Sequence, residues 1–160
     1  MLGLLFLGTT LSMHVAGAHA APASTKAAVE QTAPATQASV LHSVSRGNVF
    51  PYPACTWWAN QRYAQWYGGF VPWTTNAMAW QWKDRARDFG WRVSTQPTVG
   101  SIIDLQPWVQ GAYGAGHVAF VERVLGNGHV IASNMSWGAN QYAVVYREFA
   151  PGPGVTFISR

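Results

Sequence analysis

Residues 117–135 read HVAFVERVLGNGHVIASNM, two apolar runs on either side of a Gly-Asn-Gly turn. Runs rich in β-branched and large apolar residues are typical of strands, and Asn-Gly is the strongest short signal for a hairpin. A two-residue turn at 127–128 pairs Gly126 with His129 and makes the two runs antiparallel neighbours. The sequence therefore predicts an antiparallel hairpin here.

The register of this hairpin decides which side chains share a face of the sheet. With the two-residue turn, Val121 lies opposite Asn134. Side chains alternate along each strand, so His117, Asn134 and Ser136 project to one side. Glu122 then lies on the opposite face, where we expect a structural role. A longer turn would shift the register by one residue and move Asn134 to the opposite face from His117.

Two helices are predicted before the hairpin. A helix over 55–67 follows from its apolar stripe and from the glycine pair at 68–69 that ends it. A second helix begins at Thr75 or Asn76, either of which can cap it, and ends at Gly90. The stripes expected to be buried are Ala59, Tyr63, Trp66 and Phe70 on the first helix and Met78, Trp82, Ala86 and Phe89 on the second.

Short apolar runs predict strands on both sides of the hairpin. The expected strands cover residues 99–105, 118–125, 129–135, 142–149 and 155–158. Helices followed by sequential strands indicate an α+β fold, in which the N-terminal helices pack on an antiparallel β-sheet.

The composition limits the class of protein. The chain has 160 residues, 49% of them hydrophobic and 10% charged, which is enough apolar material for one folded domain and excludes a disordered chain. A single Cys excludes an internal disulfide framework and zinc modules built on several cysteines, and we expect no metal and no cofactor.

The net charge of +4 favours binding to anionic polymers, including those of the cell wall. The basic residues form no block or nucleic-acid-binding motif, so no nucleic-acid partner is expected.

The N-terminal segment predicts export. Residues 1–20 combine an apolar run with the small-x-small pattern at 18–20, after which signal peptidase is expected to cleave. The apolar stretch is shorter than the ~20 residues of a membrane span, so we expect no stable span after cleavage. Residues 21–47, rich in Ala, Thr, Ser and Pro, are typical of a flexible linker, and residues 48–160 form the predicted domain. We expect a secreted protein that is extracellular or associated with the cell wall.

Cys55 is the first candidate for chemistry. It stands at the start of the helix predicted over 55–67, where the partial positive charge of a helix N-terminus favours a thiolate. A nucleophile and a small buried hydrophobe are both consistent with this position alone. A nucleophilic thiol needs a base, and histidine is a common one.

Five histidines are candidates for that base. His14 and His19 leave with the signal segment, and His42 lies in the linker. His129 lies at the hairpin turn, where we expect it to be solvated. His117 opens a strand after a Gly-Ala-Gly run, a setting that suits the wall of a site. His117 is therefore the predicted base.

A third polar side chain can hold the imidazole of the base through its Nδ1 atom, as in catalytic triads. Asn134 is the candidate on the strand face shared with His117, and Ser136 is a candidate helper. Trp57 and Trp137 are candidates for lining a substrate groove, whereas most of the 9 Trp are expected in the core.

Five short blocks of sequence follow one another in an order and at a spacing that resemble those of a known protein family. They are FPYPACTWW at 50–58, the Trp, Asn-Ala and Trp positions at 73, 76–77 and 80, VGSI at 99–102, GHVAFVE at 116–122 and SNMSW at 133–137. Together they resemble the CHAP family, the cysteine, histidine-dependent amidohydrolases/peptidases, from residue 48 to the C-terminus. The resemblance implies a papain-like α+β fold and hydrolysis of amide bonds in bacterial peptidoglycan. It also implies that Cys55 is the nucleophile and His117 the base.

Two departures from the family pattern concern the site. The usual run Ser-Glu-Met-Asn-Trp is Ser-Asn-Met-Ser-Trp here, so Asn134 replaces the Glu and Ser136 the Asn. An Asn can orient the His, as in papain-like Cys-His-Asn sites, but it offers no charge to an imidazolium. Pro53 and Ala54 replace the frequent Gly-Gln, so backbone N–H groups at the helix start would have to form the oxyanion hole.

Two hypotheses of function follow, and both take the cell-wall glycopeptide as the partner. The first is a secreted cysteine amidohydrolase or endopeptidase, of the N-acetylmuramoyl-L-alanine amidase type, acting through Cys55, His117 and Asn134. The alternative is a cell-wall-binding module on the same fold with weak or lost catalysis. The altered block at 133–137 and the aromatic content motivate it.

Overall fold

The computed structural model describes residues 47–75 and 77–160. The predicted signal segment 1–20 lies outside the described residues, as do Asn76 and all of the predicted linker 21–47 except its last residue. Within the described ranges, no helix is both long enough and apolar enough to cross a membrane.

Helix α1 (Cys55–Tyr67) has the bounds that the sequence predicts and ends at a glycine with a left-handed backbone. Ala59 and Tyr63 of its stripe are buried, but Trp66 is 46% exposed. The guanidinium of Arg62 lies over the Trp66 ring, 5.2 Å from its centroid, and covers it at the surface. The buried stripe therefore ends at Tyr63, since Trp66 is exposed and Phe70, the last predicted position, is only partly buried.

The second helix begins later than predicted. A 3₁₀ turn η1 (Ala79–Gln81) leads into α2 (Trp82–Asp88), so the predicted start at 75–76 is wrong. Met78 has an extended backbone and is 57% exposed instead of buried. The first turn of α2 is capped by the carboxylate of Asp104, which comes from a strand, so a local cap is not used.

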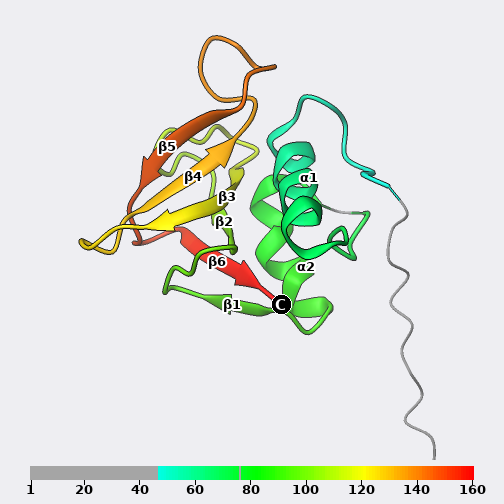
Figure 1. Ribbon diagram of the computed structural model, residues 1–160, viewed down its shortest axis with the longest axis horizontal. Coiled ribbons are helices and arrows are strands. Elements are labelled where there is room, and N and C mark those ends of the chain that lie inside the picture. The colour runs from blue at the N-terminus through cyan, green and yellow to red at the C-terminus, as the bar shows by residue number, and fades with distance from the viewer. Residues whose placement is uncertain (1–46, 76) are drawn as a thin grey trace, which may run out of the picture. The chain divides into compact units, whose positions relative to one another are not determined.

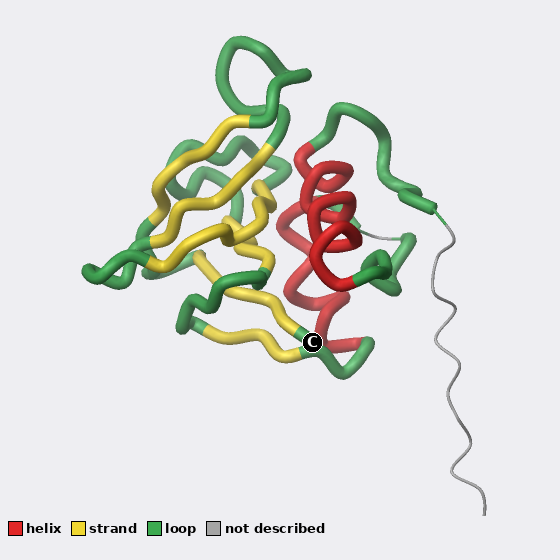
Figure 2. The backbone as a smooth tube through the Cα atoms, viewed as in Figure 1, coloured by secondary structure: helices red, strands yellow, loops and turns green. Residues whose placement is uncertain are grey.

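Six strands form one antiparallel sheet in the order β1-β6-β2-β3-β4-β5, with both helices beside it (Figure 1). The strands are β1 (Arg92–Ser94), β2 (Ile102–Leu105), β3 (His117–Val124), β4 (Val130–Asn134), β5 (Val145–Phe149) and β6 (Val155–Ser159). The predicted α+β class is confirmed, and Figure 2 shows the helices and the strands as separate layers. Five strands overlap the predicted runs, whereas β1 was not predicted because three residues carry too little pattern.

The two faces of the sheet bury different clusters. On the face toward the helices, Val118 and Phe120 of β3 pack with the buried residues of α1 and α2. On the other face, Ala119 and Val121 pack in a cluster that includes Ala112 of the loop 106–116. Alternate residues of β3 therefore point into different cores, as the pleat of a strand requires.

The turn of the β3–β4 hairpin is one residue longer than predicted. The N–H of Leu125 donates to the carbonyl of His129 at 2.8 Å and encloses the three-residue loop 126–128. Leu125, and not Gly126, thus faces His129, because the αL glycine at the end of the loop favours a three-residue connection. This shifts the register of the hairpin by one residue.

A bulge in β3 shifts the register by one residue more. Val121 pairs with Ala132 and Arg123 with Ile131, which leaves an extra residue between them on β3. The predicted pairing of Val121 with Asn134 is therefore wrong. Because two shifts of one residue restore the alternation of faces, His117 and Asn134 still project to the same side.

Candidate active site

Cys55 is the first residue of α1, and it is partly buried. Burial raises the pKa of its thiol, and the charge of Asp104 acts in the same direction. Hydrogen bonds from the backbone N–H groups of Val118, Thr56 and Cys55 itself lower the pKa, but by less. The thiol therefore keeps its proton at neutral pH, although the helix N-terminus alone would favour a thiolate.

His117 is the first residue of β3, and only 4% of it is exposed. Its Nε2 lies 3.2 Å from Oδ1 of Asn134. The Nδ2 of Asn134 donates to the carbonyl of Val145 at 3.1 Å, which turns Oδ1 toward the ring. Nε2 is thus the donor and Nδ1 keeps a free lone pair. The predicted contact through Nδ1 is wrong, because the alternation of faces does not determine which edge of the ring meets Asn134.

The imidazole of His117 is neutral at neutral pH. Burial lowers its pKa to about 4, and the hydrogen bond to Asn134 opposes this shift only in part. An amide carries no net charge and so cannot stabilise an imidazolium as a carboxylate would. Cys55 and His117 therefore rest as a neutral thiol and a neutral imidazole.

Cys55 and His117 line one groove of about 450 Å³. Its walls are formed by the segments 111–117 and 136–138, which carry no acidic side chain, lysine or arginine. The part of the chain that the structure describes holds no cluster of three or more His, Cys, Asp or Glu that could bind a metal ion. The groove thus presents a thiol and an imidazole in otherwise uncharged surroundings.

Two of the three other predicted side chains line this groove. Ser136 and Trp137 belong to its wall, and the Trp137 ring lies 4.5 Å from the ring of His117 between centroids. Trp57 does not line this groove, and its ring packs edge-on against Tyr52 at 4.8 Å. The candidate site therefore brings together all the predicted residues except Trp57.

The sequence model of the CHAP domain matches residues 45–136, more than half of the chain. The chain belongs to the CHAP domain family. It is 36% identical over 105 residues to a probable autolysin of Staphylococcus aureus and 39% identical over 100 residues to an N-acetylmuramoyl-L-alanine amidase of Staphylococcus haemolyticus. These alignments cover 66% and 62% of this chain but only 37% and 28% of those relatives. The chain thus spans about a third of their length.

The fold of this CHAP domain is similar to that of a solved relative. The crystal structure of an N-acetylmuramoyl-L-alanine amidase from Staphylococcus aureus matches it with a TM-score of 0.64 and 24% sequence identity. The match covers 72% of this chain and 33% of that one. The fold expected from the resemblance is therefore confirmed.

In this CHAP domain, a polar network that the sequence pattern does not reveal joins α1 to β3 and β4. Arg62 of α1 donates to both carboxylate oxygens of Glu122 on β3, at 2.8 and 2.9 Å. The hydroxyl of Ser133 on β4 donates to Glu122 at 2.7 Å and accepts the indole N–H of Trp58 at 3.0 Å. Glu122 thus holds the helix that carries Cys55 against the strands that carry His117 and Asn134.

Asp104 on β2 is a second buried anchor of the CHAP domain. Its carboxylate accepts the backbone N–H of Lys83 at 2.9 Å and the side-chain amide of Gln106 at 3.0 Å. Gln106 also donates to the carbonyl of Trp80 at 3.0 Å, so the turn before α2 is tied to the sheet. Burial raises the pKa of Asp104 to about 6. Its only signal in the sequence is a lone acid within the apolar run 99–105.

Gly116 lies in the groove wall at a position that excludes a side chain. Its backbone is left-handed (φ 69°), and a Cβ atom would lie 2.7 Å from the carbonyl oxygen of Leu105 and 2.9 Å from the nitrogen of Trp80. Since backbone atoms would have to move, Gly116→Ala is expected to lower the free energy of unfolding by about 2 kcal/mol or more, measured by urea titration. Gly126→Ala is the control, because a Cβ there meets no atom within 4 Å. Equal losses in the two variants would contradict this account.

Proposed function

We propose that this chain is a peptidoglycan amidohydrolase with Cys55 as nucleophile, His117 as base and Asn134 as the positioning residue. The observation that carries the proposal is the groove shared by Cys55 and His117, with Nε2 of the imidazole engaged by Asn134. Membership of the CHAP family and similarity to a staphylococcal autolysin and amidase support peptidoglycan as the substrate. The export signal predicted at 1–20 agrees with action outside the cell, at the wall.

In the first half of the proposed reaction, the acyl group of the scissile amide moves to sulphur. Nδ1 of His117 accepts the thiol proton as Sγ of Cys55 attacks the carbonyl carbon. Backbone N–H groups of Cys55 and Thr56, at the start of α1, stabilise the oxyanion. The C–N bond breaks as His117 returns the proton to the leaving nitrogen, which gives a thioester and a free amine.

In the second half, water releases the acyl group. His117 takes a proton from water as the oxygen adds to the thioester carbonyl. The C–S bond then breaks, the thiolate regains the proton, and a free carboxylic acid leaves. One amide and one water thus give one amine and one acid, and no oxidant, reductant or metal enters the balance.

The proposed mechanism distinguishes an amine side and an acyl side of the site, because His117 has to reach the leaving nitrogen to return the proton to it. The amine part of the substrate has to lie over His117, in the groove already described. A second cavity of about 330 Å³ shares Cys55 with that groove but is not lined by His117. Its lining comes mainly from the segments 50–56 and 77–79 and contains no charged side chain. We assign this acyl cavity to the part of the substrate that carries the scissile carbonyl.

Digestion of purified peptidoglycan tests the proposed function. We expect new amine and carboxyl termini in equal number, identified by mass spectrometry. Iodoacetamide should abolish their formation, because Cys55 is the single cysteine of the chain. Sedimentation with intact cell walls tests the alternative: binding without new termini would support a wall-binding module and contradict the enzyme.

A further inference from the structure

Three aromatic side chains next to the site form a cluster that we call the aromatic platform: Tyr52, Trp57 and Tyr142. The Tyr52 ring lies 4.8 Å from that of Trp57 and 6.0 Å from that of Tyr142, between centroids. Tyr52 and Tyr142 nevertheless remain 55% and 57% exposed. The platform thus joins the turn before α1 to the loop after β4 and keeps much of its ring surface in solvent.

The segments that carry the platform and line the groove contain no acidic side chain, lysine or arginine. The segments 47–61, 105–116 and 134–146 contain no Asp, Glu, Lys or Arg, although the net charge of the chain is +4. An acidic peptide or an anionic polymer would be recognised by basic side chains, which these segments lack. An uncharged ligand therefore suits this surface better than a charged one.

The exposed groups of the platform match the chemistry of a neutral sugar. A pyranose ring has an apolar C–H face, which can stack on an aromatic ring, and a polar edge of hydroxyl and acetamido groups. Tyr52 and Tyr142 offer both a ring face and a hydroxyl. Ser136 and Gln141, in the same loop as Tyr142, are exposed and can exchange hydrogen bonds with such an edge.

The loop 106–116, which also lines the groove, presents two more aromatic rings. Trp108 and Tyr113 are 75% and 80% exposed. Trp108 has a left-handed backbone (φ 69°), a strained state for a bulky residue. Gln110 fixes the loop through two hydrogen bonds to the backbone of Ala150, at 2.7 and 2.9 Å. Strained backbone of this kind is typical of functional sites, where surrounding structure holds it in place.

We propose that the aromatic platform binds the glycan strand of the cell wall, a neutral chain of N-acetylated pyranose sugars, by stacking on Tyr52 and Tyr142. The inference rests on the proposed function and adds a sugar subsite to it. Pro51 and Ala54, on either side of Tyr52, line the acyl cavity. The platform therefore borders the side of the site that we assign to the acyl part of the substrate.

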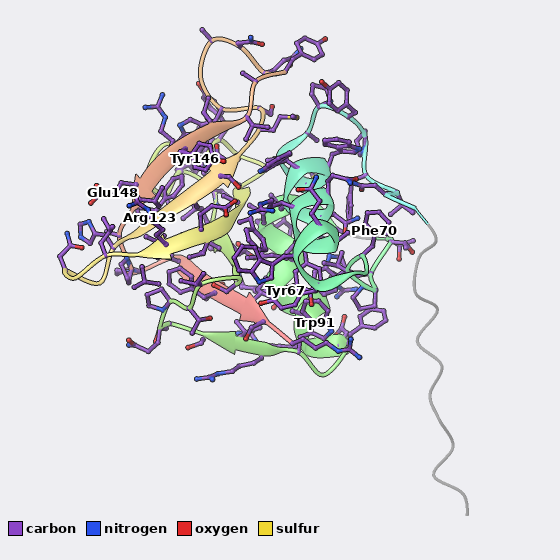
Figure 3. The ribbon with its side chains drawn as sticks, viewed as in Figure 1. Tyr67, Phe70, Trp91, Arg123, Tyr146 and Glu148 are labelled. Atoms are coloured by element: carbon purple, nitrogen blue, oxygen red, sulfur yellow. The ribbon has the colours of Figure 1, made fainter. Side chains whose placement is uncertain are left out.

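Titration with N-acetylchitotetraose, a neutral sugar chain without peptide, tests the platform. Intrinsic tryptophan fluorescence should report saturable binding to the whole chain, because Trp57 belongs to the platform. Tyr52→Ala and Tyr142→Ala should each weaken binding by about 10-fold, whereas Tyr142→Phe, which keeps the ring, should stay within about 3-fold of the unchanged protein. Tyr146→Ala is the control and is expected to have no effect. Tyr146 lies on β5 (Figure 3), outside the platform, and is 62% exposed.

The outcomes separate this inference from the proposed function. No sugar binding, or equal losses for Tyr142→Ala and Tyr146→Ala, would overturn the platform even if peptidoglycan is hydrolysed. Binding of a free stem peptide in place of the sugar would overturn it too. Sugar binding that responds to the platform variants would support it even in a protein that cleaves nothing. Binding should also be nearly independent of salt, because neither partner is charged at the contact.

Discussion

Replacement of Cys55 by Ala is expected to reduce the rate of peptidoglycan hydrolysis by at least about 10⁴-fold. The chain has one cysteine, so no second thiol can form the acyl intermediate. His117 alone can activate water, but it cannot supply the thioester that divides the reaction into two easier steps. Initial rates of amine release from purified peptidoglycan measure the loss.

Two further variants show whether Cys55 and His117 act as a unit. His117→Ala should cost about as much as Cys55→Ala, and the double variant should be no slower than either alone, because each loss already removes the covalent route. Circular dichroism and urea unfolding should show all three variants folded. A Cys55→Ala protein that keeps a tenth of the rate would contradict the mechanism.

The charge states of Cys55 and His117 show that burial can outweigh the effect of a helix N-terminus. The position of Cys55 at a helix N-terminus predicts a thiolate, since the helix dipole favours the anion. Burial has the larger effect on the thiol, and it also lowers the pKa of His117 to about 4. In the proposed mechanism, the proton therefore moves to His117 while sulphur attacks the carbonyl carbon. Burial is a property of the folded chain, so the sequence could not predict this state.

Elements defined by local signals were predicted well. The bounds of α1 match because a proline-rich turn precedes Cys55 and a glycine with φ 78° follows the helix. The start of α2 was wrong because its cap is Asp104, a strand residue distant along the chain from Lys83, whose N–H it binds. The place of β6 between β1 and β2 also depends on contacts distant along the chain, which periodicity does not show.

The shared face of His117 and Asn134 was predicted correctly from a register that was wrong. The three-residue turn moves the register by one residue, and the bulge beside Glu122 moves it by another. Since side chains alternate with a period of two, only the sum of the shifts decides the face. Neither a turn length nor a bulge follows reliably from a Gly-Asn-Gly sequence.

Asn134 is expected to act on the rate through the orientation of His117. Its Oδ1 accepts Nε2–H of the ring, while its Nδ2 is fixed by the carbonyl of Val145. Asn134→Ala removes this constraint, so the imidazole can turn away from Cys55, and kcat should fall by about 100-fold. Gln96→Ala is the control, because Gln96 is an exposed amide side chain that lines neither the groove nor the acyl cavity, and it should leave kcat within about 3-fold. Equal losses in the two variants would mean that Asn134 does not position the base.

Asn134→Glu is expected to move the acid limb of the pH–rate profile to higher pH. The unchanged protein needs a neutral imidazole, so its activity should fall as the pH decreases through the His117 pKa of about 4. A carboxylate facing Nε2–H favours the charged imidazolium and raises that pKa, by about 1 to 3 units for a close opposite charge. The variant should therefore lose activity at a pH where the unchanged protein and Gln96→Ala remain active, as shown by kcat/KM measured from pH 3 to 8. An acid limb that stays in place would show that His117 does not titrate as the base, because a new charge beside its ring has to change its pKa.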